Sequence, residues 1–204
     1  MKNIITENEI ELFLESEPKL RKYVNLVNLE LKPTMSPPFD RLIESVIFQQ
    51  LSGKAASTIF GRFVNLIGEM TPENILKYKF EDFRAVGLSS QKSQYVRNIA
   101  MEFIANGSMN NYRSADSLND LANDEIISLF TKIKGVGEWT VEMYLIFGLG
   151  RLNVFSSKDL GVRKGLKKMY NLEDLPTPKE TKELTKSWNN STIGNILCWR
   201  ILDV

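Results

Sequence analysis

The chain of 204 residues contains no histidine and a single cysteine. The absence of histidine excludes Ser-His-Asp and Cys-His catalysis, imidazole general bases and the usual Cys/His zinc sites. One cysteine makes neither an internal disulfide nor a cysteine-ligated iron–sulfur cluster. Cys198 lies in the apolar run Ile196-Leu197-Cys198-Trp199, where a buried thiol is expected. Any chemistry must therefore use carboxylates, lysines, hydroxyls or the backbone.

Long apolar runs and a strong net charge are also missing. No segment approaches membrane-spanning length, and the start from Met1 to Glu7 lacks the apolar core of a signal peptide. We therefore expect a cytoplasmic protein, associated with the nucleoid if the source is prokaryotic. The net charge of +1 does not by itself indicate nucleic-acid binding. A hydrophobic content of 43% predicts one sizeable domain or two small lobes.

The sequence contains helical periodicity from end to end and no convincing strand, which predicts an all-α fold. Several helix starts are marked by a capping residue, by a proline in the first turn, or by both. These starts are Thr6 with Glu9, Thr71-Pro72, and Thr177-Pro178 with Glu180.

The stretch 133–147 contains a two-glycine turn, Lys134-Gly135-Val136-Gly137, between two apolar-periodic segments. Glycines permit backbone angles that a Cβ would forbid, so the turn could press main chain against a ligand. Residues 139–147 continue as an apolar helix, and the N–H groups at its start would form an anion site suited to phosphate. The alternative is a corner in which the glycines only let two helices pack closely. The turn alone leaves both interpretations open.

A second corner follows the helix that carries Phe39, Val46 and Phe48. Its residues 49–52 are Gln-Gln-Leu-Ser, and Ser52 is placed to cap a further helix. Glutamine amides and an exposed leucine suit contact with base edges or the filling of a gap in a duplex. The alternative is a polar loop with Leu51 in the core, which the local sequence favours.

Asp159 stands where another helix is predicted to begin, so N–H donors and the helix dipole would keep its carboxylate ionised. Such a carboxylate suits a developing cation, although the commoner use of an aspartate there is simply to cap the helix. Asp159 is the only acid among six basic residues, a pattern that suits a polyanion held near a cationic reacting centre. These basic residues are Arg151, Lys158, Arg163, Lys164, Lys167 and Lys168. By frequency, Trp188 and Trp199 are interpreted as core residues.

Four separated motifs together resemble the helix-hairpin-helix DNA glycosylases of the 3-methyladenine DNA glycosylase II type. The resemblance extends over residues 36–202, and agreement among four motifs makes it specific, whereas the hairpin alone would be weak. The motifs are Gly135-Val136-Gly137-Glu138-Trp139-Thr140, Phe48-Gln49-Gln50-Leu51-Ser52-Gly53-Lys54-Ala55-Ala56, Gly87-Leu88-Ser89 with Lys92 and Tyr95, and Val154-Phe155 with Asp159-Leu160-Gly161-Val162-Arg163-Lys164.

The resemblance implies an all-helical, two-lobed fold with the active site in the cleft between the lobes. One lobe would combine 1–35 with 150–204, and the other, 36–149, would contain the hairpin at about 127–147. The implied activity belongs to base excision repair: a monomer that flips an alkylated purine out of double-stranded DNA and hydrolyses its N-glycosidic bond. Two alternatives remain, a glycosylase of the same fold for an oxidised or deaminated base, and a non-catalytic helix-hairpin-helix DNA-binding protein.

The resemblance also implies roles for single residues. Asp159 matches the family's catalytic aspartate, and Gln50 or Leu51 lies where a side chain fills the gap left by the flipped nucleotide. The hairpin would hold a DNA phosphate, with a sodium or potassium ion on the carbonyls near Gly135 and Gly137 and no side-chain metal site. The implied DNA-binding residues are Lys134, Gly135, Val136, Gly137, Thr140, Gln50, Leu51, Ser52, Lys54 and Lys164. The implied walls of the base pocket are Phe48, Trp139, Met143 and Trp188.

The proposed chemistry fits a site without histidine. An alkylated purine carries positive charge and is already a good leaving group, so one aspartate could suffice to stabilise the cationic sugar. Bifunctional relatives place a lysine nucleophile where Trp139 stands, so we expect no Schiff base and a monofunctional enzyme without an iron–sulfur centre. Residues 189–192, Asn-Asn-Ser-Thr, replace a Pro-aromatic-Arg-Ser pattern common in the family, which leaves the range of lesions open.

Overall fold

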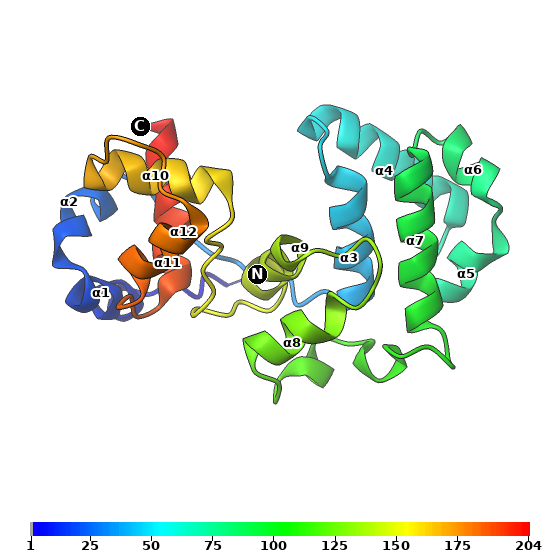
Figure 1. The fold of residues 1–204 in the computed structure, drawn as a ribbon. Coiled ribbons are helices and arrows are strands. Elements are labelled where there is room, and N and C mark those ends of the chain that lie inside the picture. Colours follow the sequence, from blue (N-terminus) through cyan, green and yellow to red (C-terminus); the bar gives the residue numbers. More distant parts are fainter. Residues whose placement is uncertain (1) are drawn as a thin grey trace. The chain divides into compact units, whose positions relative to one another are not determined.

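The computed structural model describes residues 2–204, and all regular elements in that range are helices (Figure 1). The predicted all-α class is therefore confirmed. No helix within this range has both the length and the apolar character needed to cross a bilayer. The α-helices are α1 (Glu7–Ser16), α2 (Arg21–Val24), α3 (Pro38–Phe48), α4 (Gly53–Ile67), α5 (Pro72–Lys77), α6 (Phe80–Ala85), α7 (Ser90–Phe103), α8 (Asn123–Phe130), α9 (Glu138–Met143), α10 (Leu160–Tyr170), α11 (Pro178–Thr185) and α12 (Ser191–Arg200). Short 3₁₀ helices lie at η1 (Pro18–Leu20), η2 (Asn110–Tyr112), η3 (Asp116–Leu118) and η5 (Ile201–Asp203), and η4 (Tyr144–Gly148) is a π-helical turn.

The predicted helix caps are confirmed. Thr6 accepts a hydrogen bond from the N–H of Glu9 at 3.3 Å, and Thr71 accepts one from the N–H of Asn74 at 3.1 Å. Thr177 and Glu180 form a reciprocal capping box, in which each side chain accepts the other residue's N–H. These bonds satisfy N–H groups that the helix itself leaves without acceptors, which explains why the starts could be predicted from local sequence.

The chain folds into two compact units, one inserted into the other. The inserted unit is Met35–Tyr144, and the split unit combines Met1–Thr34 with Leu145–Val204. The second change of unit falls inside a continuous helical segment, where α9 runs into the π-helical turn η4. The lobes expected from the sequence change at 35/36 and 149/150, whereas these units change at 34/35 and 144/145.

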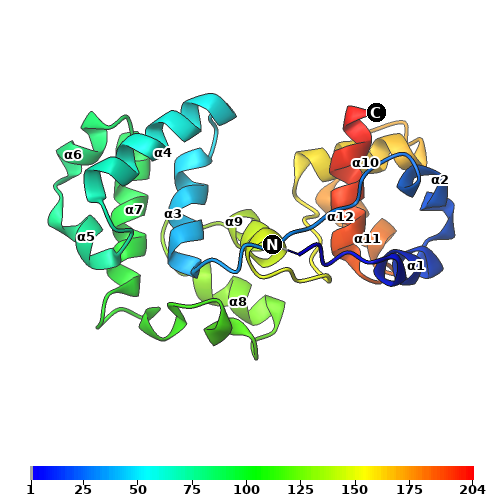
Figure 2. The ribbon, with the colours of Figure 1, turned by 180° about the vertical axis from the view of Figure 1, so that it is seen from behind.

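The inserted unit is organised around α7, which packs against α3, α5 and α6 and lies beside α3 in both views (Figures 1 and 2). A chain of buried rings fills its centre. Phe103 has its ring centroid 5.5 Å from that of Phe39 and 6.1 Å from that of Phe130, which in turn meets Tyr144 at 6.3 Å. Full burial of such a side chain contributes roughly 1.5–3 kcal/mol, so these rings fix the helices that carry the corner and the hairpin.

The split unit is built on α10 and α12, which pack closely because Gly165 has no side chain. A methyl group at Gly165 would lie 2.2 Å from the carbonyl oxygen of Cys198. Cys198 is fully buried, as predicted, and burial raises the pKa of its thiol. Trp188 meets the rings of Phe13 and Phe155 edge-on at 5.2 and 5.4 Å. Helix α1 is thereby attached to the C-terminal part of the chain.

Candidate nucleic-acid interface and active site

The two glycines of the hairpin between α8 and α9 have different functions. Gly135 adopts φ 111°, and a methyl group there would lie 2.3 Å from Cγ of Tyr95 on α7. Gly137 precedes α9, and a methyl group there would meet no atom within 4 Å. Gly135 is therefore required for close packing, while Gly137 leaves the turn open to an approaching ligand. Both interpretations drawn from the sequence apply, one to each glycine.

The other two hairpin residues face opposite ways. The side chain of Lys134 is exposed, and its carbonyl accepts a hydrogen bond from Nδ2 of Asn98 at 3.0 Å. Val136 is buried, and its N–H donates to the carbonyl of Ile133 at 3.0 Å. The turn is thus anchored by Val136 and held from α7, with the lysine ammonium directed to solvent.

The corner at 49–52 links α3 to α4 and projects outward. Gln50 adopts the left-handed φ of 57°, and Leu51 is 39% exposed. The expectation that Leu51 is tucked into the core is therefore wrong, because the left-handed turn at Gln50 directs the chain out to the surface. Ser52 caps α4 by accepting the N–H of Ala55 at 3.4 Å, as predicted, and Lys54 is exposed in the first turn.

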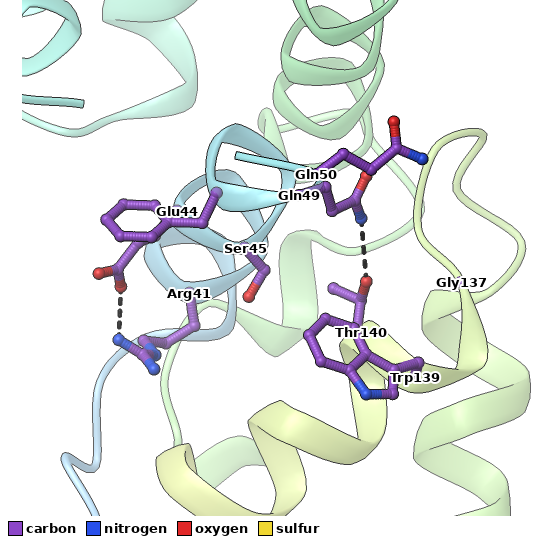
Figure 3. A pocket seen from close by; sticks show the side chains of 9 residues that line it. Arg41, Glu44, Ser45, Gln49, Gln50, Gly137, Trp139 and Thr140 are labelled. Carbon is purple, nitrogen blue, oxygen red and sulfur yellow. Dashed lines mark hydrogen bonds and ion pairs between the residues drawn. The ribbon is translucent and has the colours of Figure 1, made fainter. Parts of the chain in front are cut away.

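A hydrogen bond joins this corner to the helix after the hairpin. Nε2 of Gln49 donates to Oγ1 of Thr140 at 3.2 Å, while Gln50 extends away from Thr140 (Figure 3). Thr140 is only 2% exposed, so its hydroxyl contacts the corner inside the unit. The sequence predicted Thr140 as a DNA contact; the role stays a prediction, and the link to Gln49 was not foreseen.

Beside this bond lies a pocket of about 550 Å³, lined by Phe48, Gln49 and Trp139 among others (Figure 3). Trp139 is 43% exposed, and the ring of Phe48 meets that of Phe60 at 5.9 Å. Two of the predicted base-pocket residues, Phe48 and Trp139, therefore line the same pocket. Met143 is half-buried in α9 and does not line this pocket.

Trp188 contrasts with these pocket residues, because it belongs to the split unit and is 7% exposed between Phe13 and Phe155. A ring enclosed in this way is a core residue of its unit and offers little surface to a base. The structure thus favours the first interpretation of Trp188 over its assignment to the base pocket.

Asp159 is the N-cap of α10, as predicted, and two donors meet its Oδ1 atom. The N–H of Val162 donates at 2.8 Å and Nε1 of Trp199 at 2.9 Å. The Trp199 ring also stacks on that of Phe147, with centroids 5.8 Å apart and planes 20° apart. A methyl group at Gly161 would lie 2.9 Å from Trp199. Trp199, interpreted from sequence as core, is half-exposed and orients the candidate catalytic carboxylate.

Helix α12 also holds the chain that leads to Asp159. Oγ1 of Thr192 accepts the N–H of Val154 at 2.9 Å and donates to the carbonyl of Arg151 at 2.8 Å. Oδ1 of Asn195 accepts the N–H of Ser156 at 3.0 Å. Thr192 and Asn195 are fully buried. The only local signal of this role is the spacing of Thr192, Asn195 and Trp199, which places them along one side of a helix.

The basic residues near Asp159 are partly structural. Nε of Arg163 donates to the carbonyl of Pro176 at 2.6 Å, and Lys167 and Lys168 donate to the carbonyls of Glu173 and Ile201 at 2.7 and 2.8 Å. Lys164 is exposed on α10, which agrees with its predicted contact with DNA without testing it. The basic pattern in the sequence thus combines fold-stabilising side chains with exposed ones.

Residues 2–204 contain no cluster of three or more histidine, cysteine, aspartate or glutamate side chains positioned to hold a metal. A cation at the hairpin would therefore be coordinated by main-chain carbonyls, and its presence stays a prediction.

Residues 43–190 match the HhH-GPD superfamily of base excision DNA repair proteins, which is more than half of the chain. The chain therefore belongs to this family, and the resemblance inferred from the four motifs is confirmed. Its curated relatives include DNA-3-methyladenine glycosylase 1 of Schizosaccharomyces pombe, which is 36% identical over 178 residues, covering 85% of this chain and 76% of that protein.

A second relative, DNA-3-methyladenine glycosylase of Saccharomyces cerevisiae, is 36% identical over 185 residues, covering 81% of this chain. The match covers 60% of the yeast protein, so this chain spans about three-fifths of that relative's length. Among solved structures, S. pombe 3-methyladenine DNA glycosylase in complex with abasic DNA aligns with a TM-score of 0.79 at 31% identity. That alignment covers 95% of each chain, so the fold is that of the family.

Proposed function

We propose that this chain is a monofunctional DNA glycosylase of base excision repair that hydrolyses the N-glycosidic bond of alkylated purines such as 3-methyladenine. The observation that carries the proposal is Asp159, held as the cap of α10 by Val162 and Trp199, in a chain of the HhH-GPD family. The relatives named above are 3-methyladenine glycosylases, which supports the choice of substrate.

The chemistry assigns the main step to Asp159. As the bond from the sugar to the alkylated base breaks, positive charge grows on the sugar, and a nearby carboxylate stabilises it. Two N–H donors on one carboxylate oxygen fix the orientation of Asp159 before the substrate arrives. The base leaves readily because alkylation has already made its ring cationic, so no histidine acid is needed.

DNA would be held by the inserted unit. The open turn at Gly137 and the exposed ammonium of Lys134 suit a phosphate, and Gln50 or Leu51 would enter the duplex. Further contacts with the DNA sugar–phosphate backbone would come from Ser52, Lys54 and, in the split unit, Lys164. Trp139 and Phe48 offer aromatic surface to an electron-poor flipped base. Where the active site lies relative to the two units stays a prediction.

We further propose that the protein acts as a cytoplasmic monomer without a cofactor. With one cysteine, the chain has too few thiolates for a cysteine-ligated iron–sulfur cluster. The proposal includes one bound ion, sodium or potassium, coordinated by the hairpin carbonyls near Gly135 and Gly137.

The decisive experiment measures base release from duplexes that each contain one defined lesion, alkylated, oxidised or deaminated. The wild type should release the alkylated purine, and Asp159→Asn should lose most of that activity, about a hundredfold or more. Asp174→Asn, an exposed aspartate of the same unit, is the matched control and should remain active. Full activity in Asp159→Asn would refute the catalytic assignment. If the wild type released only oxidised or deaminated bases, the assignment of alkylated purines as the substrate would be wrong.

Borohydride trapping tests the monofunctional mechanism separately. Because Trp139 stands where bifunctional relatives carry the lysine nucleophile, incubation with a lesion duplex and borohydride should give no covalent protein–DNA adduct. An adduct formed at an intact lesion would contradict the mechanism.

A further inference from the structure

Lys92 on α7 is a half-buried lysine that pairs with carbonyl oxygens. Its Nζ donates to the carbonyl of Ile47 at 2.8 Å and to that of Gln49 at 2.6 Å. No ion pair of the described residues includes it, and desolvation lowers the pKa of its ammonium. The two carbonyls lie at the C-terminal end of α3, where helical carbonyls lack intrahelical donors and a cation is favourable. Lys92 therefore closes the end of α3 at the point where the corner begins.

The corner is also held from its other side. Gln49 is bound through its carbonyl by Lys92 and through its side-chain amide to the buried Thr140 of α9. The next two residues, Gln50 and Leu51, are both exposed. The side chains proposed to enter DNA thus follow a residue that is attached at two points to the rest of the inserted unit.

The same helix holds the hairpin. The ring of Tyr95 packs against Gly135, and Asn98 donates to the carbonyl of Lys134 at 3.0 Å. Lys92, Tyr95 and Asn98 are spaced by three residues, which places them along one side of α7. Between the corner and the hairpin lies a groove of about 440 Å³, to which the first turns of α7 contribute. One helix face therefore sets the spacing between the two elements.

We propose that Lys92 is a positioning residue for base flipping, which holds the corner at a fixed spacing from the hairpin so that Gln50 or Leu51 enters the duplex in register with the bound phosphate. This inference rests on the proposed function and assigns one step of it. Opening a duplex costs a few kcal/mol of pairing and stacking energy per base. A loosely held corner would be displaced by the duplex and would not separate the bases. Lys92 does not touch the substrate in this mechanism.

The test compares two substrates that differ only in the cost of flipping. One duplex carries the alkylated purine paired with its normal partner base, and the other carries the same lesion opposite an abasic site, where no pairing must be broken. Lys92→Met, which keeps the apolar stem and removes the ammonium, should slow single-turnover release from the paired lesion about tenfold. Release from the unpaired lesion should change less than about threefold.

Two further variants separate positioning from general damage. Lys92→Arg retains a cation that reaches the carbonyls and should recover most of the activity on the paired lesion. Lys77→Met is the matched control, because Lys77 is an exposed lysine of the same unit whose Nζ donates to the side chain of Asn74. If Lys92→Met fails to fold, as judged by thermal unfolding, Gln49→Ala breaks the second attachment of the corner and should show the same dependence on pairing.

The outcomes are distinguishable. Equal losses on the two substrates, or no loss on either, would overturn the role of Lys92 while leaving the glycosylase intact. Failure of the wild type to release any base from either duplex would instead overturn the proposed function. A fluorescent base analogue beside the lesion should report reduced flipping in Lys92→Met and normal flipping in Lys77→Met.

Discussion

Each of the two units holds an irregular candidate-site segment by side chains from one helix, but the two helices do so differently. In the split unit, α12 holds residues 151–159 through Thr192 and Asn195, which are short and fully buried. In the inserted unit, α7 holds the corner and the hairpin through Lys92 and Asn98, which are only half-buried. The segment before the catalytic candidate is therefore attached by buried hydrogen bonds, and the candidate DNA contacts by part-buried or exposed ones.

The two kinds of attachment suit different demands on the two segments. Breaking a buried hydrogen bond leaves an unsatisfied polar group that costs about 1–3 kcal/mol, so the segment before Asp159 stays fixed. At a partly solvated bond, water replaces a lost partner at smaller cost. A carboxylate that stabilises a transient charge needs one fixed position. Under the proposed function, the corner and hairpin would instead follow a duplex whose shape changes as a base leaves it.

The largest effect is expected from separating α12 from α10. Gly165→Ala would place a methyl group 2.2 Å from the backbone oxygen of Cys198, so the helices must move apart. We expect a loss of more than about 3 kcal/mol in the free energy of unfolding. Gly61→Ala, in open space on α4, is the control and should gain up to ~1 kcal/mol. Denaturant titration measures both, and equal stabilities would refute the close packing.

The next test compares one bond from each helix. Asn195→Ala leaves the buried N–H of Ser156 without its acceptor and should cost about 1–3 kcal/mol in unfolding free energy. Asn98→Ala removes the exposed bond to Lys134 and should cost less than about 1 kcal/mol. Thermal and denaturant unfolding of both variants give the difference. If Asn98→Ala proved as destabilising as Asn195→Ala, the contrast between the units would not hold.

Trp199→Phe tests how much the candidate catalytic carboxylate depends on its side-chain donor. The variant keeps an aromatic ring against Phe147 but loses the N–H that donates to Asp159. We expect single-turnover base release to fall about tenfold, with substrate affinity nearly unchanged, because the carboxylate loses orientation and DNA contacts are untouched. Unfolding measured in parallel should show little loss of stability. Unchanged release would remove Trp199 from the mechanism.

The smallest expected effect concerns Asp40, in the first turn of α3. Burial first, and the charge of Glu44 second, raise the pKa of Asp40. A carboxyl whose folded pKa is raised contributes stability below its unfolded pKa and loses that contribution as pH rises through the folded value. The stability of Asp40→Asn relative to wild type should therefore increase between pH 3 and pH 7. Chemical denaturation at both pH values measures this change, and a decrease would contradict the direction of the shift.

The features that could be predicted from the sequence are those that depend on residues close by along the chain. The caps at Thr6, Thr71 and Thr177 and the N-cap role of Asp159 involve donors three residues away, so local pattern was sufficient. The two-glycine turn was also visible, although the separate functions of its glycines depend on Tyr95, which is distant in sequence.

What the sequence did not reveal depends on partners far along the chain. Trp199 meets Asp159 across 40 positions, and Lys92 reaches Ile47 across 45. Such residues look like ordinary core or surface positions until the fold brings their partners near. Leu51 is a different case, because the left-handed φ of the adjacent Gln50, which the local pattern did not indicate, directs it outward.

The insertion of one unit into the other dictates an order of folding during synthesis. The inserted unit is complete once Tyr144 has left the ribosome, while the split unit still lacks most of its residues. Phe13 of α1 can pack against Trp188 only after Trp188 has been synthesised. The hydrogen bond from the N–H of Thr34 likewise requires the carbonyl of Phe147. At about 5–20 residues per second, synthesis from Phe13 to Trp188 takes roughly 10–35 seconds, and the apolar face of α1 lacks this partner until then. The chain of the inserted unit is thus complete before that of the unit that carries Asp159, and α1 waits longest for its packing partners.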